Sequence, residues 1–412
     1  MTRARTMVAA AWTAVVLAIC VACSPAAASP ASPATASPSL ATTATVTATN
    51  AAAATARTTA ATATTATTTA ATAATIATTT TARAALDSSA PGTSVAVPST
   101  VPTSGSRPPS AISSGTRVVQ DIQGDLVTVP ANPQRVVTLS EPTLDGALAL
   151  GVTPIGTTAG RGQTTVPNYL VGRASGIPLL GAIAQPNFEA IGAAKPDLIL
   201  VDGTSITNNP PLIAELGEIA PTVFVGYAGG DWRTTFRNVA NALNRVEEGE
   251  RVLADYQQHV AEVAARLTAY DHQTFSIVRW QGGAASLILK ELPSAMALTD
   301  LGLKRPPSQD RVGRGHSEPV SQENLPEIDA DWMFFGTLGG SSVDNPQAGG
   351  GVDASAAKAA LADAARTPGF TLLHAYQAGH IIPVDGSLWT STGGPLLMNR
   401  IVDDVAAALV TP

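Results

Sequence analysis

Short apolar runs of strand length alternate with helix-like stretches from about residue 117 to the C-terminus. In the first half of this region, strands are expected at 135–139, 178–181, 197–201 and 222–225, with helices at 142–150, 188–194 and 211–216. The second half repeats the alternation, with strands at 275–278, 332–335 and 380–384 and helices at 293–301, 323–328, 354–365 and 395–409. Such short apolar strands between helices predict parallel sheets with helices on both faces.

A longer amphipathic stretch separates the two alternating regions. Its apolar positions recur at steps of three and four residues: Leu253, Tyr256, Val260, Val263 and Leu267. This spacing predicts one helix over 247–269, and its roughly 23 residues would span about 35 Å. We therefore expect an N-terminal lobe over 117–246, a connecting helix over 247–270 and a C-terminal lobe over 271–412.

Tryptophan and arginine collect in the loops expected to follow the strands, where the ligands of parallel sheets bind. Arginine offers a planar fork of donors to carboxylate, catecholate or hydroxamate oxygens, and tryptophan offers a rigid face to an aromatic or macrocyclic ligand. The alternatives are that each tryptophan packs on its own lobe, that each arginine is solvated, and that His316 only bonds within its loop. The candidate ligand-binding residues are Tyr227, Trp232, Arg233, Arg279, Trp280, Arg311, Arg314, His316 and Trp389.

The N-terminus has the features of an export signal. Arg3 and Arg5 precede an apolar run that ends near Cys23, which predicts a lipoprotein-type signal peptide over residues 1–23. Both cysteines of the chain, Cys20 and Cys23, lie in this segment, so the exported part has no disulfide and no thiolate site. Small neighbours favour acylation at Cys23, and cleavage without a lipid is the alternative.

Residues 24–116 consist almost wholly of Ala, Thr, Ser and Pro and contain no aromatic residue. Such a segment has little apolar surface to bury, so it cannot offset the entropy lost on ordering. It is predicted to be a disordered tether between the N-terminus and the lobes. A tether carrying sugars on its threonines and an unmodified spacer are both compatible with this composition.

The charge and the motifs exclude several function classes. The net charge is −7, and Asp87 is the single acidic residue before position 117, so the lobes are acidic and a nucleic-acid partner is not expected. The chain lacks the G-x-S-x-G, P-loop and H-E-x-x-H motifs. His374 and His380 are six residues apart, which does not place them on one helical face. We expect no enzymatic activity, no cofactor and no directly bound metal ion.

Two stretches, 187–200 and 320–335, share a pattern in which a glutamate near the start of a short helix precedes a buried strand. The glutamates are Glu189 and Glu323. With the opening segment 121–137 and the closing segment 379–405, in this order, the chain resembles the substrate-binding proteins of ABC importers that capture ferric siderophores, haem and cobalamin. The resemblance implies two Rossmann-like α/β lobes with parallel sheets, joined by one long helix, with a ligand cleft between them. It also implies that Glu189 and Glu323 pair with arginines of the membrane permease.

The same resemblance implies an exported monomer, lipid-anchored at the outer face of the cytoplasmic membrane, that captures a ferric siderophore and delivers it to an ABC permease. Haem and cobalamin are the alternative ligands, and haem would need Tyr169, Tyr227 or His316 as an axial ligand. A rival interpretation is an envelope protein of the same fold that binds wall or glycan components. The sequence identifies neither the siderophore nor the permease.

Overall fold

A computed structural model of the chain describes residues 115–410, except 184, 207–209, 314 and 341–349. The expected signal peptide with its acylation site Cys23, most of the tether, and Arg314 lie outside the described residues. All the described residues, and so both lobes, belong to one compact unit. No helix in the described part of the chain has the length and apolar character needed to cross a membrane.

The first lobe is built on a six-stranded sheet, preceded by the hairpin of β1 (Thr116–Gln120) and β2 (Leu126–Pro130). The strand order is β6-β5-β4-β3-β7-β8, and all neighbours are parallel except β5 and β6. The strands are β3 (Val136–Thr138), β4 (Gly156–Ala159), β5 (Leu179–Ala182), β6 (Gln185–Pro186), β7 (Leu198–Val201) and β8 (Thr222–Phe224).

Helices cover both faces of this sheet, as the alternation predicts. One face packs against α1 (Glu141–Ala149) and α5 (Trp232–Ala242), and the other against α2 (Phe188–Ala194) and α4 (Pro210–Gly217). Two further short helices, α3 (Gly203–Ile206) and η1 (Asn168–Leu170), follow strand ends. Alternate residues of β7 belong to different apolar clusters, because successive side chains of a strand point to opposite faces.

The second lobe contains a five-stranded sheet in the order β11-β10-β9-β12-β13. Three adjacent strands, β9 (Phe275–Gln281), β12 (Trp332–Gly336) and the edge strand β13 (Ile381–Pro383), are parallel. The strands β10 (Ala284–Leu287) and β11 (Glu318–Val320) are antiparallel to their neighbours. The second sheet is therefore mixed: the expected parallel pairing holds for β9, β12 and β13, and the antiparallel strands β10 and β11 were not predicted. Gly282 and Gly283 both have positive φ, 60° and 79°, and form a two-residue turn that returns the chain antiparallel to β9.

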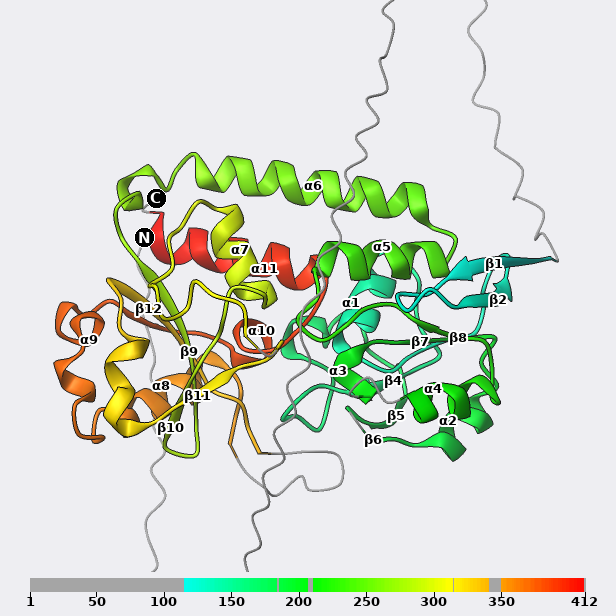
Figure 1. Cartoon of the computed structure of the whole chain (residues 1–412), viewed down its shortest axis with the longest axis horizontal. Coiled ribbons are helices and arrows are strands. Elements are labelled where there is room, and N and C mark those ends of the chain that lie inside the picture. Colours follow the sequence, from blue (N-terminus) through cyan, green and yellow to red (C-terminus); the bar gives the residue numbers. More distant parts are fainter. Residues whose placement is uncertain (1–114, 184, 207–209, 314, 341–349, 411–412) are drawn as a thin grey trace, which may run out of the picture. The chain divides into compact units, whose positions relative to one another are not determined.

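The connecting helix α6 (Val246–Ala264) runs along both lobes (Figure 1). Its 19 residues span about 28 Å, less than expected, because the chain leaves the α-helix before the short turn η2 (Thr268–Tyr270). The apolar face of α6 belongs to a core that includes residues of both sheets. The remaining helices are α7 (Pro293–Asp300), η3 (Gln322–Ile328), α8 (Ala354–Ala364), η4 (Phe370–Leu372), α9 (His374–Ala378), α10 (Gly386–Trp389) and α11 (Pro395–Leu409).

A buried carboxylate also joins the lobes. Asp145 on α1 is completely buried and accepts hydrogen bonds from the backbone N–H groups of Leu396 and Leu397, each at 2.9 Å. These two groups belong to the first turn of α11, where a negative charge is favoured by the helix dipole. The Tyr169 hydroxyl also donates to Asp145, at 2.9 Å. Because its hydroxyl is engaged in this way, Tyr169 is not free to serve as the haem ligand considered above.

Candidate functional site

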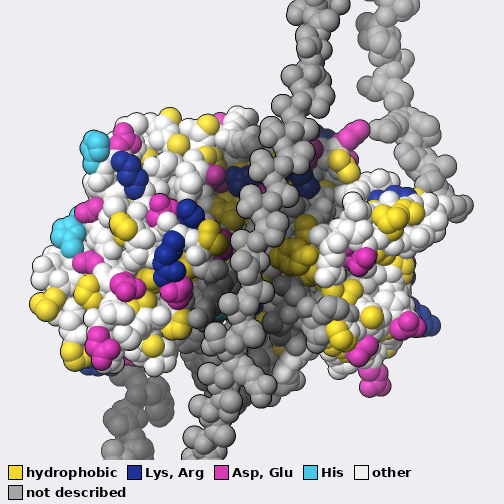
Figure 2. All heavy atoms as spheres, viewed as in Figure 1, with side chains coloured by type: hydrophobic (Ala, Val, Ile, Leu, Met, Phe, Trp, Pro, Cys, Tyr) yellow, Lys and Arg dark blue, Asp and Glu magenta, His cyan; other side chains and the backbone are white. Residues whose placement is uncertain are grey.

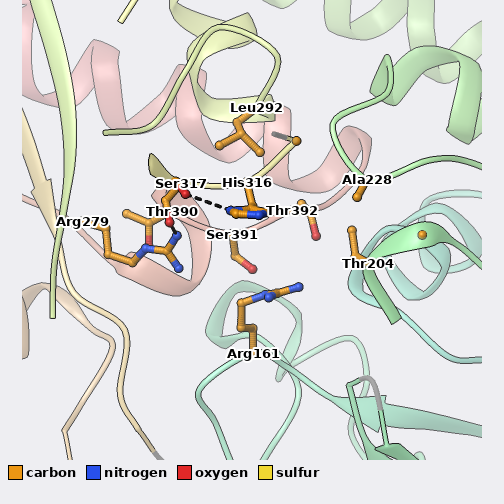
Figure 3. A pocket seen from close by; sticks show the side chains of 12 residues that line it. Arg161, Thr204, Ala228, Arg279, Leu292, His316, Ser317, Thr390, Ser391 and Thr392 are labelled. Atoms are coloured by element: carbon orange, nitrogen blue, oxygen red, sulfur yellow. Dashed lines mark hydrogen bonds between the residues drawn. The ribbon is translucent and has the colours of Figure 1, made fainter. Parts of the chain in front are cut away.

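A cavity of about 150 Å³ lies between the two lobes. Arg161, Thr204 and Ala228 line it from the first lobe, and all three lie just beyond the carboxyl ends of strands. The second lobe contributes a β9 side chain and residues of three segments, at 292, 315–317 and 390–392 (Figure 3). The lining residues of the second lobe are Arg279, Leu292, Gly315, His316, Ser317, Thr390, Ser391 and Thr392.

Arg161 and Arg279 point into this cavity from opposite lobes (Figure 3). Burial, together with the neighbouring charge of Arg161, lowers the pKa of Arg279 to about 10, although Glu141 acts in the opposite direction. Arg279 still carries its charge at neutral pH and donates to the Ser317 hydroxyl. Within the described residues, neither arginine has a carboxylate oxygen within 4.0 Å. Two unpaired cations in a partly dehydrated cavity favour an anionic ligand.

Glu141 connects the two walls of the cavity. Its side chain is only 2% exposed, and its Oε1 accepts a hydrogen bond from the backbone N–H of Arg161 at 2.8 Å. Its Oε2 accepts from the hydroxyls of Ser391 at 2.6 Å and Thr392 at 3.0 Å. Glu141 begins α1, which Ser140 caps through the backbone N–H of Thr143. One carboxylate therefore holds the Arg161 loop of the first lobe against the 390–392 loop of the second.

Four of the predicted ligand-binding residues line this cavity or the recess beside it, and one of them, Trp232, does so only with an edge of its ring. Arg279 and His316 line it, and His316 is exposed with its Nδ1 2.8 Å from the Ser317 carbonyl oxygen. Tyr227 is 43% exposed and lines a small recess next to the cavity. Their contact with a ligand remains a prediction.

The tryptophans do not present their rings to the cavity, which corrects the expectation for Trp232, Trp280 and Trp389. They are 3%, 3% and 0% exposed. The Trp389 ring stacks on Phe334 at 4.1 Å, and its indole N–H donates to Asp404 at 3.0 Å. These residues belong to α5, β9 and α10 rather than to loops, so their rings face the cores of the lobes, and only an edge of Trp232 reaches the recess.

Two predicted arginines are also engaged elsewhere. Arg233 pairs with Asp300 at 2.6 Å and lies 4.8 Å from the Trp232 ring. Arg311 makes two parallel hydrogen bonds to Glu318, at 3.0 and 2.6 Å. Neither lines the cavity. Both were expected to meet a ligand because they fall in segments predicted to be cleft loops, but each is paired with a carboxylate of its own lobe or of the neighbouring one.

The sequence interpretation missed Arg161. It lies between Gly160 and Gly162, and a glycine pair by itself predicts only a loop. The preceding strand β4 (Gly156–Ala159) is too short and polar to be predicted from its apolar pattern. Gly162 has a φ of 68°, and a Cβ there would lie 2.5 Å from the Gly339 carbonyl oxygen of the second lobe. The glycine thus permits the close approach of the lobes beside Arg161.

The predicted docking glutamates lie outside the cavity. Glu189 is exposed in the first turn of α2, and Glu323 is exposed in the first turn of η3. The segment of Glu323 is a 3-10 helix rather than the expected α-helix, and Pro326 within it cannot donate a backbone hydrogen bond. Neither carboxylate forms an ion pair within 4.0 Å with a residue that the structure describes. Their docking role remains a prediction.

Residues 136–388, more than half of the chain, match the family described as periplasmic binding protein. The chain belongs to the periplasmic binding protein family. This confirms the resemblance drawn from the paired glutamate stretches and the expected α/β fold. The family consists of substrate-binding proteins. On the face shown in Figure 2, acidic and basic side chains are interspersed over the second lobe rather than gathered into one basic surface.

Similar proteins include two from Bacillus subtilis. "Probable siderophore-binding lipoprotein YfiY" is 30% identical over 71% of this chain and 87% of its own length, and the Fe(3+)-citrate-binding protein YfmC is 28% identical over 56% and 71%. Among solved structures, Staphylococcus aureus SirA complexed with staphyloferrin B superposes with a TM-score of 0.60 and 24% identity. That match covers 71% of this chain and 98% of SirA, and it supports the fold.

Proposed function

We propose that this periplasmic binding protein captures a ferric siderophore outside the cytoplasm and delivers it to an ABC importer. The observation that carries the proposal is the pair Arg161 and Arg279, which face one cavity from opposite lobes without a carboxylate partner in the described part of the chain. The siderophore and ferric citrate ligands in the names of its relatives support the same ligand class.

The chemistry of the cavity suits a chelated iron rather than a free ion. The guanidinium groups and the Ser317 hydroxyl, which itself accepts from Arg279, can donate hydrogen bonds to ligand oxygens, which in a ferric complex carry negative charge. A charge-assisted hydrogen bond of this kind contributes about 1.5–3 kcal/mol. The complex is therefore cargo held by its organic shell, with no chemical step and no resident cofactor in this proposal.

Two further parts of the proposal concern delivery. Glu189 and Glu323, exposed on different lobes, would meet basic residues of the permease and orient docking more than they add affinity. An acyl chain on Cys23 would anchor the protein at the outer face of the cytoplasmic membrane, with the segment before residue 115 as its tether. The word lipoprotein in the name of YfiY supports this anchor.

The test is a fluorescence titration of the purified full chain with ferric citrate, ferrioxamine B and ferric enterobactin, with haem and cyanocobalamin in parallel. Energy transfer from the buried tryptophans to a coloured ferric complex should quench emission saturably at submicromolar concentration. Saturation by haem or cyanocobalamin alone would replace the siderophore by that ligand. No response to any of the five would contradict the proposal and favour the binding of wall or glycan components.

A further inference from the structure

The loop that carries Arg161 is tied to the second lobe through one buried carboxylate. The backbone N–H of Arg161 donates to Oε1 of Glu141 at 2.8 Å, within the first lobe. The other oxygen, Oε2, accepts from two hydroxyls of the second lobe, those of Ser391 at 2.6 Å and Thr392 at 3.0 Å. Glu141 is 2% exposed, so these bonds are shielded from water and stronger than exposed ones. The two oxygens of one carboxylate therefore engage different lobes.

A second contact joins the same loop to the second lobe. Gly162, the neighbour of Arg161, has a φ of 68°, and a Cβ there would lie 2.5 Å from the Gly339 carbonyl oxygen. A side chain at this position would push the loop away from the second lobe. Arg161 thus lies beside two contacts with the second lobe, one through Glu141 to its own backbone and one at the next residue.

The hydroxyls of segment 390–392 hold protein groups rather than a ligand. A hydroxyl has a single hydrogen, and Ser391 and Thr392 both donate theirs to Glu141 Oε2. Thr390 donates its own to the Gly386 carbonyl oxygen at 2.8 Å. These three residues line the cavity, but their hydrogens are already used. Their effect on an anionic ligand is therefore indirect, through the carboxylate that two of them hold.

We propose that Glu141 is a positioning residue, which fixes Arg161 opposite Arg279 only while segment 390–392 of the second lobe engages its other oxygen. The pair of arginines that binds the anion is then completed by contact between the lobes. Glu141 is not among the residues that line the cavity, so it acts through Arg161 rather than on the ligand. The inference rests on the proposed function and adds a residue that sets affinity without touching the ligand.

The double variant Ser391→Ala/Thr392→Val tests this role, because it removes the bonds between the lobes while keeping the charge of Glu141 and its bond to Arg161. In fluorescence titrations of the full chain with ferric citrate, an anionic complex, it should bind about tenfold more weakly than the parent. The same two changes should cost less than about threefold when Arg161 is already Ala. A loss equally large in the Arg161→Ala background would mean that the hydroxyls act on the ligand without Arg161, and would overturn the proposal.

A milder variant covers the case in which the double variant does not fold. Thr392→Val leaves the Ser391 bond in place, and it should weaken binding about threefold in the parent and not at all in the Arg161→Ala background. A loss that persists in that background would again overturn the proposal.

Asn168→Ala is the matched control, because it removes another hydrogen bond between the lobes. The Asn168 side-chain amide donates to Asp385 at 2.8 Å, and neither residue lines the cavity. This variant should bind ferric citrate within about twofold of the parent. A loss as large as that of the double variant would mean that contact between the lobes in general sets the affinity, and would refute a specific role for Glu141.

A second readout needs no ligand and decides the case in which no ferric complex binds and the proposed function fails. Hydrogen exchange of the Arg161 amide is followed by NMR in the full chain labelled with ¹⁵N-arginine, with the resonance assigned by Arg161→Lys. The double variant should speed this exchange at least about tenfold, although it leaves the acceptor Glu141 in place, and Asn168→Ala should not change it. An exchange rate in the double variant within about twofold of the parent would refute the coupling of Arg161 to the second lobe.

Discussion

Replacing Asp145 by Ala should destabilise the protein, because it removes an acceptor shared by three donors at the junction of the lobes. The donors are the backbone N–H groups of Leu396 and Leu397 and the Tyr169 hydroxyl, each 2.9 Å from a carboxylate oxygen. An unsatisfied buried donor costs about 1–3 kcal/mol, so the three together would cost about 3–9 kcal/mol. A second effect opposes this loss and reduces the expected value.

Burial raises the pKa of Asp145, and its hydrogen bonds only partly reverse this shift. A raised pKa in the folded state means that stability is greatest below the unfolded pKa and is lost as pH rises through the folded pKa, when the carboxylate ionises. At pH 7 the Ala variant has no buried carboxylate to ionise, so it does not lose this stability. We therefore expect a net loss of about 2–4 kcal/mol in the free energy of unfolding, or about 3–6 °C in Tm for a folded region of about 300 residues.

Urea and thermal unfolding of the full chain at pH 7 measure this loss, with Asp255→Ala on the exposed face of α6 as the matched control. The variant Asp145→Asn should be intermediate, because its amide oxygen still accepts while its amide nitrogen faces a backbone N–H group. An Asp145→Ala variant as stable as the control would refute the reasoning that this carboxylate joins the lobes.

Three further predictions concern the cavity, docking and pH. Arg279→Ala should weaken binding of the best ferric ligand about ten- to a hundredfold, and Arg279→Lys should restore part of the affinity. Arg311→Ala should change the affinity by less than twofold, because Arg311 is paired with Glu318. Equal losses of affinity for Arg279→Ala and Arg311→Ala in fluorescence titrations would reject this assignment. Changing Glu189 and Glu323 together to Ala should leave affinity intact and abolish uptake by whole cells, and a tenfold loss of affinity would place these glutamates in the ligand site instead. Burial raises the pKa of Asp202 from 3.8 to about 6, so its protonated form favours the folded state, and this contribution of about 3 kcal/mol is lost as pH rises from 4 to 6. The free energy of unfolding of Asp202→Asn, measured with urea at pH 4, 5 and 7, should lack this loss. If it changes with pH as the free energy of the parent does, the raised pKa of Asp202 is rejected.

The alternation of strands and helices was predictable where apolar runs are long or helix boundaries are marked. Residues 188–194 and 395–409 form helices with the predicted bounds, since Asn187 caps one and Pro395 begins the other. The hairpin of β9 and β10 was missed because its return depends on two glycines with positive φ, which composition alone does not distinguish from a loop. Strand β4, with the sequence Gly-Thr-Thr-Ala, has too little apolar character to be recognised.

The site was predictable in position but only partly in its residues. Loops after parallel strands were expected to form the cleft, and Arg279 and His316 do line the cavity. The direction of a side chain, however, depends on neighbours distant in sequence. Trp389 faces Phe334 and Asp404 rather than the cavity. Arg161, between two glycines, becomes recognisable only when the fold brings it opposite Arg279 (Figure 3).

The most direct test of the proposed function is the position of iron in crystals of the chain grown with the ferric complex that binds most tightly. The anomalous X-ray signal of iron locates the metal without assumptions about the organic shell. We predict one iron in the cavity bounded by Arg161, Arg279 and His316, with ligand oxygens within hydrogen-bonding distance of both guanidinium groups. Iron bound elsewhere on the protein, or a cavity without iron at saturating ligand, would contradict the account.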